Sequence, residues 1–186
     1  MNVLPRVFAF LAGSIFFFLV ACREPHPNQY HDWPVYLSDK SSSQFSTVDQ
    51  INTENVNQLE IAWTYDAGER PENSRIQMEC NPLIIDGVLY GTTAQLIVFA
   101  LDASTGEAHW GFDPYETRIA QGTGPVNRLG VNRGLTYWSN GKEKRLLYVS
   151  ENYLYAIDAE TGQLIDSFGT NGRTDLKKGL GRNIDT

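Results

Sequence analysis

The chain has 186 residues, of which 41% are hydrophobic and 20% charged, and its formal net charge is −7. An acidic chain without runs of Lys and Arg argues against nucleic acid as a partner. Its two cysteines, Cys22 and Cys80, belong to no C-x-x-C-H haem motif and to no paired-cysteine zinc motif.

The N-terminus is typical of a secretory signal peptide. A short positive segment precedes an uncharged apolar run over residues 7–21, and a helix of that length spans about 22 Å, against about 30 Å for a membrane core. The run ends in Leu-Val-Ala-Cys22, which resembles a bacterial lipoprotein box, so we expect a lipid on Cys22. The alternative is a plain signal peptide with a chance cysteine. We interpret residues 1–21 as a lipoprotein signal peptide and residues 22–31 as a tether.

Lipidation of Cys22 leaves Cys80 without a partner for an intrachain disulfide. A lone cysteine in an oxidising compartment is expected to be buried, and this is our prediction for Cys80.

After the tether, short β-rich runs alternate with turn signals. Residues 46–59 indicate an irregular stretch with a short helical turn after Thr53, and the alternation over residues 59–65 predicts a strand. Asp86-Gly87 between two β-rich runs is a strong hairpin signal. Further strands are predicted at residues 97–101, 107–112, 135–138, 145–150, 154–157 and 164–168, with a long functional loop over residues 113–134.

One phrase occurs twice, as A-x-D-A-x-T-G beginning at Ala100 and at Ala156. Apolar residues alternate up to each copy, the Asp, Thr and Gly turn the chain, and a second strand begins. A repeated hairpin of this kind points to the blades of a β-propeller. Trp110 follows the first copy and is expected to pack its ring between adjacent blades. Asp166 stands at the corresponding place in the second copy, with Phe168 two residues later, so that contact should be weaker or displaced.

The predicted fold is all-β, with residues 32–186 forming about three blades at roughly 40–50 residues per blade. An open arc of three blades exposes two unpaired sheet edges and the apolar faces between blades. We therefore expect these residues to be the N-terminal portion of a longer protein.

Five phrases, in order, resemble the quinoprotein dehydrogenases that use pyrroloquinoline quinone (PQQ), an eight-bladed propeller family. They are Asp32–Tyr36, Asp49–Tyr65, Glu79–Tyr90, Asn132–Trp138 and Phe168–Leu176. The resemblance implies a partial propeller, about three blades of the eight. It also implies transfer of a hydride from a sugar or other alcohol to the quinone, with a membrane quinone or a cytochrome as electron acceptor.

The resemblance further implies two cofactor-binding residues. Glu79 matches an acidic residue that hydrogen-bonds the PQQ edge, and Arg133 matches the arginine beside the reactive quinone oxygens. A fixed guanidinium suits the negative charge that reduction places on those oxygens. The family's calcium ligands and general-base aspartate are expected beyond Thr186, so no metal ligand and no catalytic residue is assigned here.

The other candidate acids and the central histidine have structural interpretations. Asp102 and Asp158 belong to the two repeated turns and are interpreted as turn carboxylates. His109 precedes Trp110 and is interpreted as a packed or exposed strand residue rather than a ligand.

The leading hypothesis is the N-terminal portion of a lipid-anchored periplasmic PQQ-dependent dehydrogenase, inactive at this length alone. No adjacent cysteine pair precedes Asn132-Arg-Gly, a feature that resembles the glucose and polyol branch more than the enzymes of simple alcohols. The alternative hypothesis is a non-catalytic propeller lipoprotein that acts as a scaffold in outer-membrane protein assembly. Such a scaffold would share the lipoprotein box and the repeats, but it has no reason to keep the phrases around Glu79 and Arg133.

Overall fold

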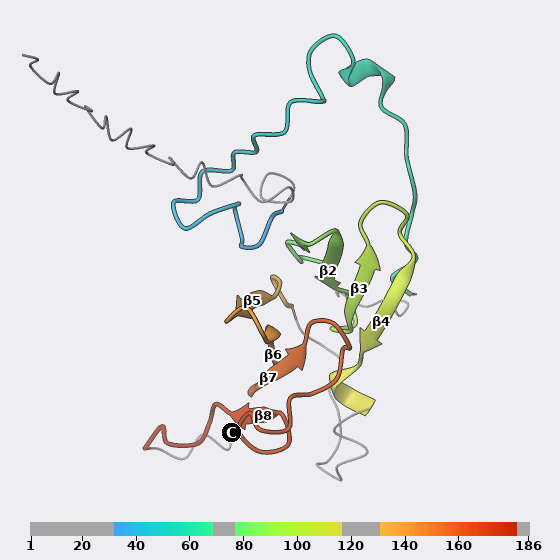
Figure 1. Ribbon diagram of the computed structural model, residues 1–186. Coiled ribbons are helices and arrows are strands. Elements are labelled where there is room, and N and C mark those ends of the chain that lie inside the picture. Colours follow the sequence, from blue (N-terminus) through green and yellow to red (C-terminus); the bar gives the residue numbers. More distant parts are fainter. Residues whose placement is uncertain (1–31, 69–76, 117–130, 182–186) are drawn as a thin grey trace, which may run out of the picture.

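The computed structural model describes residues 32–68, 77–116 and 131–181, which form two four-stranded antiparallel sheets (Figure 1). The first blade has the order β1 (Leu83–Ile85), β2 (Val88–Thr92), β3 (Val98–Asp102) and β4 (Ala108–Phe112). The second has β5 (Thr136–Ser139), β6 (Lys144–Ser150), β7 (Tyr153–Asp158) and β8 (Arg173–Asp175). A 3₁₀ turn, η1 (Val56–Gln58), follows Thr53 as predicted. The all-β, blade-built prediction is confirmed.

Several predictions fall outside the described residues. They are the signal peptide over residues 1–21, the tether over residues 22–31 with Cys22 at its start, and residues 117–130 of the predicted loop. Within the ranges that the structure describes, no helix has the length and apolar character needed to cross a membrane.

Local turn chemistry sets the hairpins. Asp86 and Gly87 both have positive φ, 51° and 78°, as the tight turn between Ile85 and Val88 requires. In the repeated turn, Asp102 Oδ1 accepts the backbone N–H groups of Ser104 and Thr105, each at 2.8 Å. Hydrogen bonds, the one from the Ser104 hydroxyl first, lower the pKa of Asp102 to about 2.

The second repeated turn has the same construction. Asp158 Oδ1 accepts the backbone N–H groups of Glu160 at 3.0 Å and Thr161 at 2.8 Å. The interpretation of both aspartates as turn carboxylates is therefore confirmed. His109 lies exposed on β4, one of the two structural positions expected for it.

Trp110 locks the two blades together, as predicted. From β4 of the first blade, its indole N–H donates to the carbonyl oxygen of Ala159 in the second blade at 3.2 Å. Its ring covers Gly162, where an added Cβ would lie 2.6 Å from the indole. The glycine of the repeat is thus required twice, for its φ of +73° and for the room it leaves to the tryptophan.

The same docking contact occurs one blade earlier. Trp63 donates its indole N–H to the carbonyl oxygen of Ala103 at 3.2 Å and covers Gly106 with its ring. Two residues on, the Tyr65 ring lies 5.0 Å from that of Phe99. Residues 59–65 therefore dock on the first blade in the same way that β4 docks on the second.

This segment corrects one strand prediction. Residues 59–65 carry no strand pairing in the described part of the chain, and Leu59 and Ile61 are 59% and 82% exposed. The alternating pattern describes a segment suited to a sheet edge, but a strand also needs a partner.

The outer strand of the second blade lies elsewhere than predicted. Residues 164–168 were expected to form it, yet Leu164 makes a single bridge with Ile157 before the chain turns away. The outer strand is β8, and its neighbour Gly172 accepts the N–H of Ala156 with its carbonyl oxygen at 3.0 Å. Gly172, not Asp166, thus takes the register position that Trp110 has in the first blade, where Trp110 pairs with Ala100.

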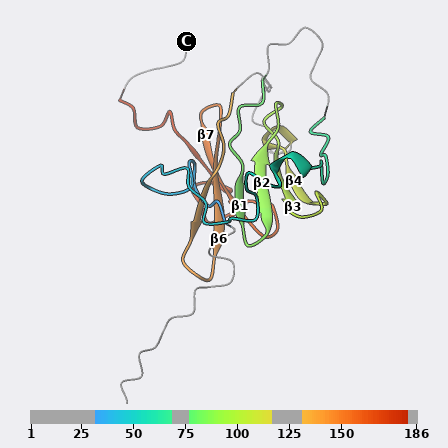
Figure 2. The ribbon, with the colours of Figure 1, turned by 90° about the horizontal axis from the view of Figure 1, so that it is seen from above.

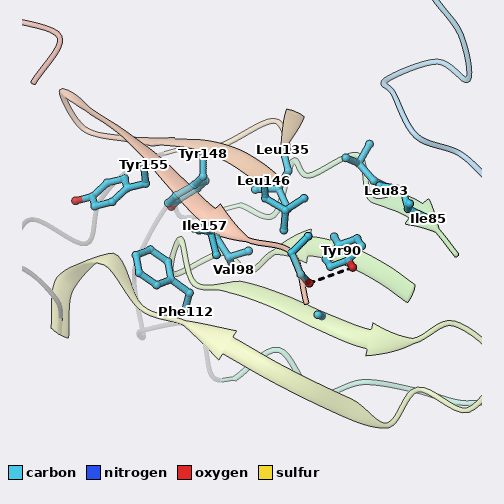
Figure 3. Packing of buried hydrophobic residues seen from close by; sticks show 12 residues of the cluster. Leu83, Ile85, Tyr90, Val98, Phe112, Leu135, Leu146, Tyr148, Tyr155 and Ile157 are labelled. Atoms are coloured by element: carbon cyan, nitrogen blue, oxygen red, sulfur yellow. Dashed lines mark hydrogen bonds between the residues drawn. The ribbon is translucent and has the colours of Figure 1, made fainter. Parts of the chain in front are cut away.

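The hydrophobic core lies between the two blades, which Figure 2 shows side by side and Figure 3 shows from close by. It is built from Leu83, Ile85, Tyr90, Val98, Ala100 and Phe112 of the first blade and Leu135, Leu146, Tyr148, Tyr155, Ile157 and Ala159 of the second. The buried Tyr90 hydroxyl donates across the interface to the Ala159 carbonyl oxygen at 3.2 Å (Figure 3). Burial raises the pKa of Tyr90 to about 12, so the hydroxyl stays a donor at neutral pH.

Candidate cofactor site

The structure brings Glu79 and Arg133 together. Glu79 lies shortly before β1 of the first blade, and Arg133 shortly before β5 of the second. Arg133 Nε lies 3.8 Å from Glu79 Oε2, although the two residues are 54 positions apart in the chain. The two residues predicted from the resemblance therefore lie together at the starts of neighbouring edge strands.

Backbone pairing sets this proximity. Asn81 forms a parallel bridge with Gly134, and the Asn81 N–H donates to the Arg133 carbonyl oxygen at 3.1 Å. The Asn81 side-chain amide reaches the same oxygen at 3.4 Å. Gly134 has a φ of +138°, and an added Cβ would lie 2.9 Å from the Asn81 carbonyl oxygen. Glycine is therefore what lets the two blades approach at this point.

The ion pair itself is weak and accessible. The Arg133 side chain is 86% exposed and that of Glu79 is 39% exposed. Exposed pairs of this kind contribute about 0–1 kcal/mol because water screens them. The guanidinium therefore keeps donors for an anionic ligand. Arg133 also lines a pocket, together with Tyr36, Asn81, Leu83, Gly134, Leu135 and Thr136.

Cys80 lies beside these residues and is half-exposed, which makes the prediction of a buried cysteine wrong. The residue precedes β1, where the chain has not yet entered the sheet. Its Sγ accepts the backbone N–H of Thr92 at 3.2 Å, so the thiol ties this segment to β2.

Sequence reasoning missed two amides, Asn81 and Asn132, which flank the candidate residues. Asn132 Oδ1 accepts the Gly134 N–H at 2.7 Å, and its Nδ2 donates to the Val149 carbonyl oxygen at 2.9 Å. Both asparagines stand within the phrases already singled out, but nothing in their spacing indicates contacts that cross from one blade to the other.

The residues present fit a planar, polyanionic quinone. Arg133 offers charged donors on an accessible side chain, and Glu79 offers a carboxylate acceptor for an N–H or hydroxyl at the edge of such a molecule. For a metal, the described ranges contain no group of three or more His, Cys, Asp or Glu side chains placed to hold an ion.

Comparison with known proteins gives concordant matches. The family model for the PQQ glucose/ethanol/alcohol dehydrogenase β-propeller domain matches residues 33–186. The dehydrogenase subunit of alcohol dehydrogenase (quinone) from Gluconobacter oxydans (strain 621H) is 40% identical over 147 residues, 78% of this chain and 17% of the relative. Quinoprotein glucose dehydrogenase from Escherichia coli (strain K12) is 30% identical over 160 residues, 80% of this chain and 20% of the relative.

A solved structure matches as well. The crystal structure of quinohemoprotein alcohol dehydrogenase from Comamonas testosteroni aligns with a TM-score of 0.57 at 28% identity, covering 80% of this chain and 20% of that one. The chain thus spans a fifth or less of the length of these relatives.

Proposed function

The chain belongs to the PQQ glucose/ethanol/alcohol dehydrogenase β-propeller family, and from this premise we propose that it contributes the N-terminal blades of a PQQ-dependent dehydrogenase. Its reaction is oxidation of a sugar or other alcohol by hydride transfer to the quinone. The observation that carries the proposal is the meeting of Glu79 and Arg133, 3.8 Å apart, at the starts of two neighbouring edge strands.

Each residue has a defined part in this proposal. PQQ, when bound, supplies the carbonyl centre that accepts the hydride. Arg133 would bind the cofactor through its guanidinium donors and would stabilise negative charge on the quinone oxygens. Glu79 would accept a hydrogen bond from the cofactor's edge, and its carboxylate lies 3.8 Å from the guanidinium. The Asn81–Gly134 bridge keeps both residues at the same end of the blades.

The remaining parts of the proposal concern the whole protein. Calcium would be held by residues outside this chain. A lipid on Cys22 would anchor the protein to a membrane facing the periplasm, where a membrane quinone or a cytochrome takes the electrons. An anchor beside the acceptor shortens the path for electron delivery.

Reconstitution tests the proposal. The complete protein, loaded with PQQ and calcium, should reduce an artificial dye in the presence of sugars or alcohols. Exchanging Arg133 for Ala should slow turnover by about 100-fold, the cost typical of losing one donor to a developing oxyanion. The matched control is Lys142→Ala, which removes an exposed cation from the β5–β6 turn and should leave turnover unchanged.

Two results would count against it. Unaltered turnover in Arg133→Ala would remove that residue from the site. No uptake of PQQ by the complete protein would favour the alternative, a non-catalytic propeller lipoprotein that acts as a scaffold in outer-membrane protein assembly.

A further inference from the structure

The side-chain amide of Asn132 joins the two blades directly beside Arg133. Its Oδ1 accepts the Gly134 N–H at 2.7 Å within its own loop. The same oxygen accepts the hydroxyl of Thr92, a buried residue of β2 in the first blade, at 3.4 Å. Its Nδ2 donates to the Val149 carbonyl oxygen of β6 in the second blade at 2.9 Å. One side chain therefore fixes the loop to both blades.

Arg133 depends on a fixed backbone because the contacts of its own side chain do little to hold the guanidinium in one position. It is 86% exposed, and its charged contact with Glu79 is 3.8 Å long. A long, exposed side chain loses rotamer entropy when it is ordered, so a mobile backbone would spread the guanidinium over many positions. The backbone on either side is held: Asn81 bonds the Arg133 carbonyl oxygen, and Asn132 bonds the next N–H, that of Gly134.

The contacts of Asn132 require an amide. An amide has an acceptor oxygen and a donor nitrogen on one short stem, and both are used here. Aspartate would keep the bond from Gly134 but present a second acceptor to the Val149 carbonyl oxygen. Serine can still accept the Gly134 N–H locally, as in an ST-turn, but it has no donor long enough to replace the amide at Val149.

We propose that Asn132 is the positioning residue of Arg133: through Gly134, Thr92 and Val149 it fixes the loop so that the guanidinium stays at the candidate cofactor site. The proposal rests on the function proposed above, in which Arg133 contacts PQQ. It names a residue that acts through Arg133 and touches neither quinone nor substrate.

The first test measures the loop without the cofactor. Hydrogen exchange of the Gly134 amide in the complete apo protein should be at least tenfold faster in Asn132→Ala and should stay near the original rate in Asn132→Ser. The matched control is Asn140→Ala, because Asn140 Oδ1 accepts the N–H groups of Lys142 and Glu143 in the β5–β6 turn, at the opposite end of β5 from Gly134. An unchanged exchange rate in Asn132→Ala would overturn the proposal.

The second test is a double-mutant cycle on the protein loaded with PQQ and calcium. Asn132→Ala and Asn132→Asp should lower kcat about 10- to 100-fold, the scale of a small misplacement of a catalytic group, with KM for the alcohol little changed. In an Arg133→Ala background the same substitution should change kcat less than twofold, because the group it positions is gone.

The outcomes separate the two proposals. If the original protein takes up PQQ and the losses from Asn132→Ala and Arg133→Ala multiply, Asn132 has a general structural role and the present proposal is wrong. If Asn132→Ala does not fold, Asn132→Asp takes its place in the cycle with the same two expectations. If the original protein takes up no PQQ, the proposed function fails and this proposal fails with it.

Discussion

Removal of the Trp110 ring should loosen the junction between the two blades by a predictable amount. Complete removal of a packed tryptophan costs about 3–5 kcal/mol, and Trp110 is half-buried, so loss of its packing is worth about 2 kcal/mol. The hydrogen bond to the Ala159 carbonyl oxygen adds about 1 kcal/mol. We expect Trp110→Ala to lower the free energy of unfolding by about 3 kcal/mol and Trp110→Phe, which keeps a ring, by about 1 kcal/mol.

Urea unfolding followed by far-UV circular dichroism would measure these changes. The matched control is Trp138→Ala, because Trp138 is 43% exposed and its ring contacts Arg145 at 5.0 Å within its own blade. That contact is worth about 0.5–1 kcal/mol. Equal losses in Trp110→Ala and Trp138→Ala would refute the docking argument.

A second substitution tests the steric part of the same junction. An alanine at Gly162 meets the indole at 2.6 Å and also has to adopt a φ of +73°. The backbone cost alone is about 1–2 kcal/mol. In the protein that keeps Trp110, Gly162→Ala should therefore lower the free energy of unfolding by more than this backbone cost. In the Trp110→Ala variant it should lower it by the backbone cost alone. Equal costs in the two backgrounds would show that the ring does not press on this position.

Three further predictions concern the site, the turns and the anchor. Gly134→Ala should weaken PQQ binding by the complete protein, measured by a titration of tryptophan fluorescence, because the added Cβ would lie 2.9 Å from the Asn81 carbonyl oxygen. The control Gly141→Ala, also at positive φ but with open space around the added Cβ, should leave PQQ binding unchanged. The pKa of Asp102 is lowered to about 2, so its stabilising effect is complete above its unfolded value near 3.8 and is lost as the pH falls towards 2; Asp102→Asn should flatten the decline of Tm over that range. Cys22→Ala should abolish incorporation of labelled palmitate into the protein, and continued labelling would exclude this cysteine as the lipidated residue.

Local sequence patterns predicted the parts of the fold that local chemistry decides. The turn at Asp86-Gly87 and the two A-x-D-A-x-T-G turns form as expected because their side chains and φ angles act within a few residues. The pattern at residues 59–65 failed because strand pairing is non-local. The outer strand of the second blade was misplaced because additional residues before Gly172 shift the register, which apolar alternation alone does not reveal.

The candidate site likewise has residues that the sequence could indicate and residues that it could not. The pairing of Glu79 with Arg133 could be anticipated only through resemblance to a family, since each residue taken alone reads as an exposed surface charge. The amides that hold the pair in place, Asn81 and Asn132, were missed because their partners lie in other strands. Contacts between side chains of distant segments produce no periodic pattern in a sequence.

The direction of the tryptophan contacts bears on how the chain folds during synthesis. Trp63 docks on a turn that lies later in the chain, at Gly106, and Trp110 docks on a later turn at Gly162. The ribosome therefore makes each ring before the turn that receives it, and a newly emerged turn finds its ring already present. Assembly of the blades can follow the order of translation, with each of these two turns captured by a segment made before it.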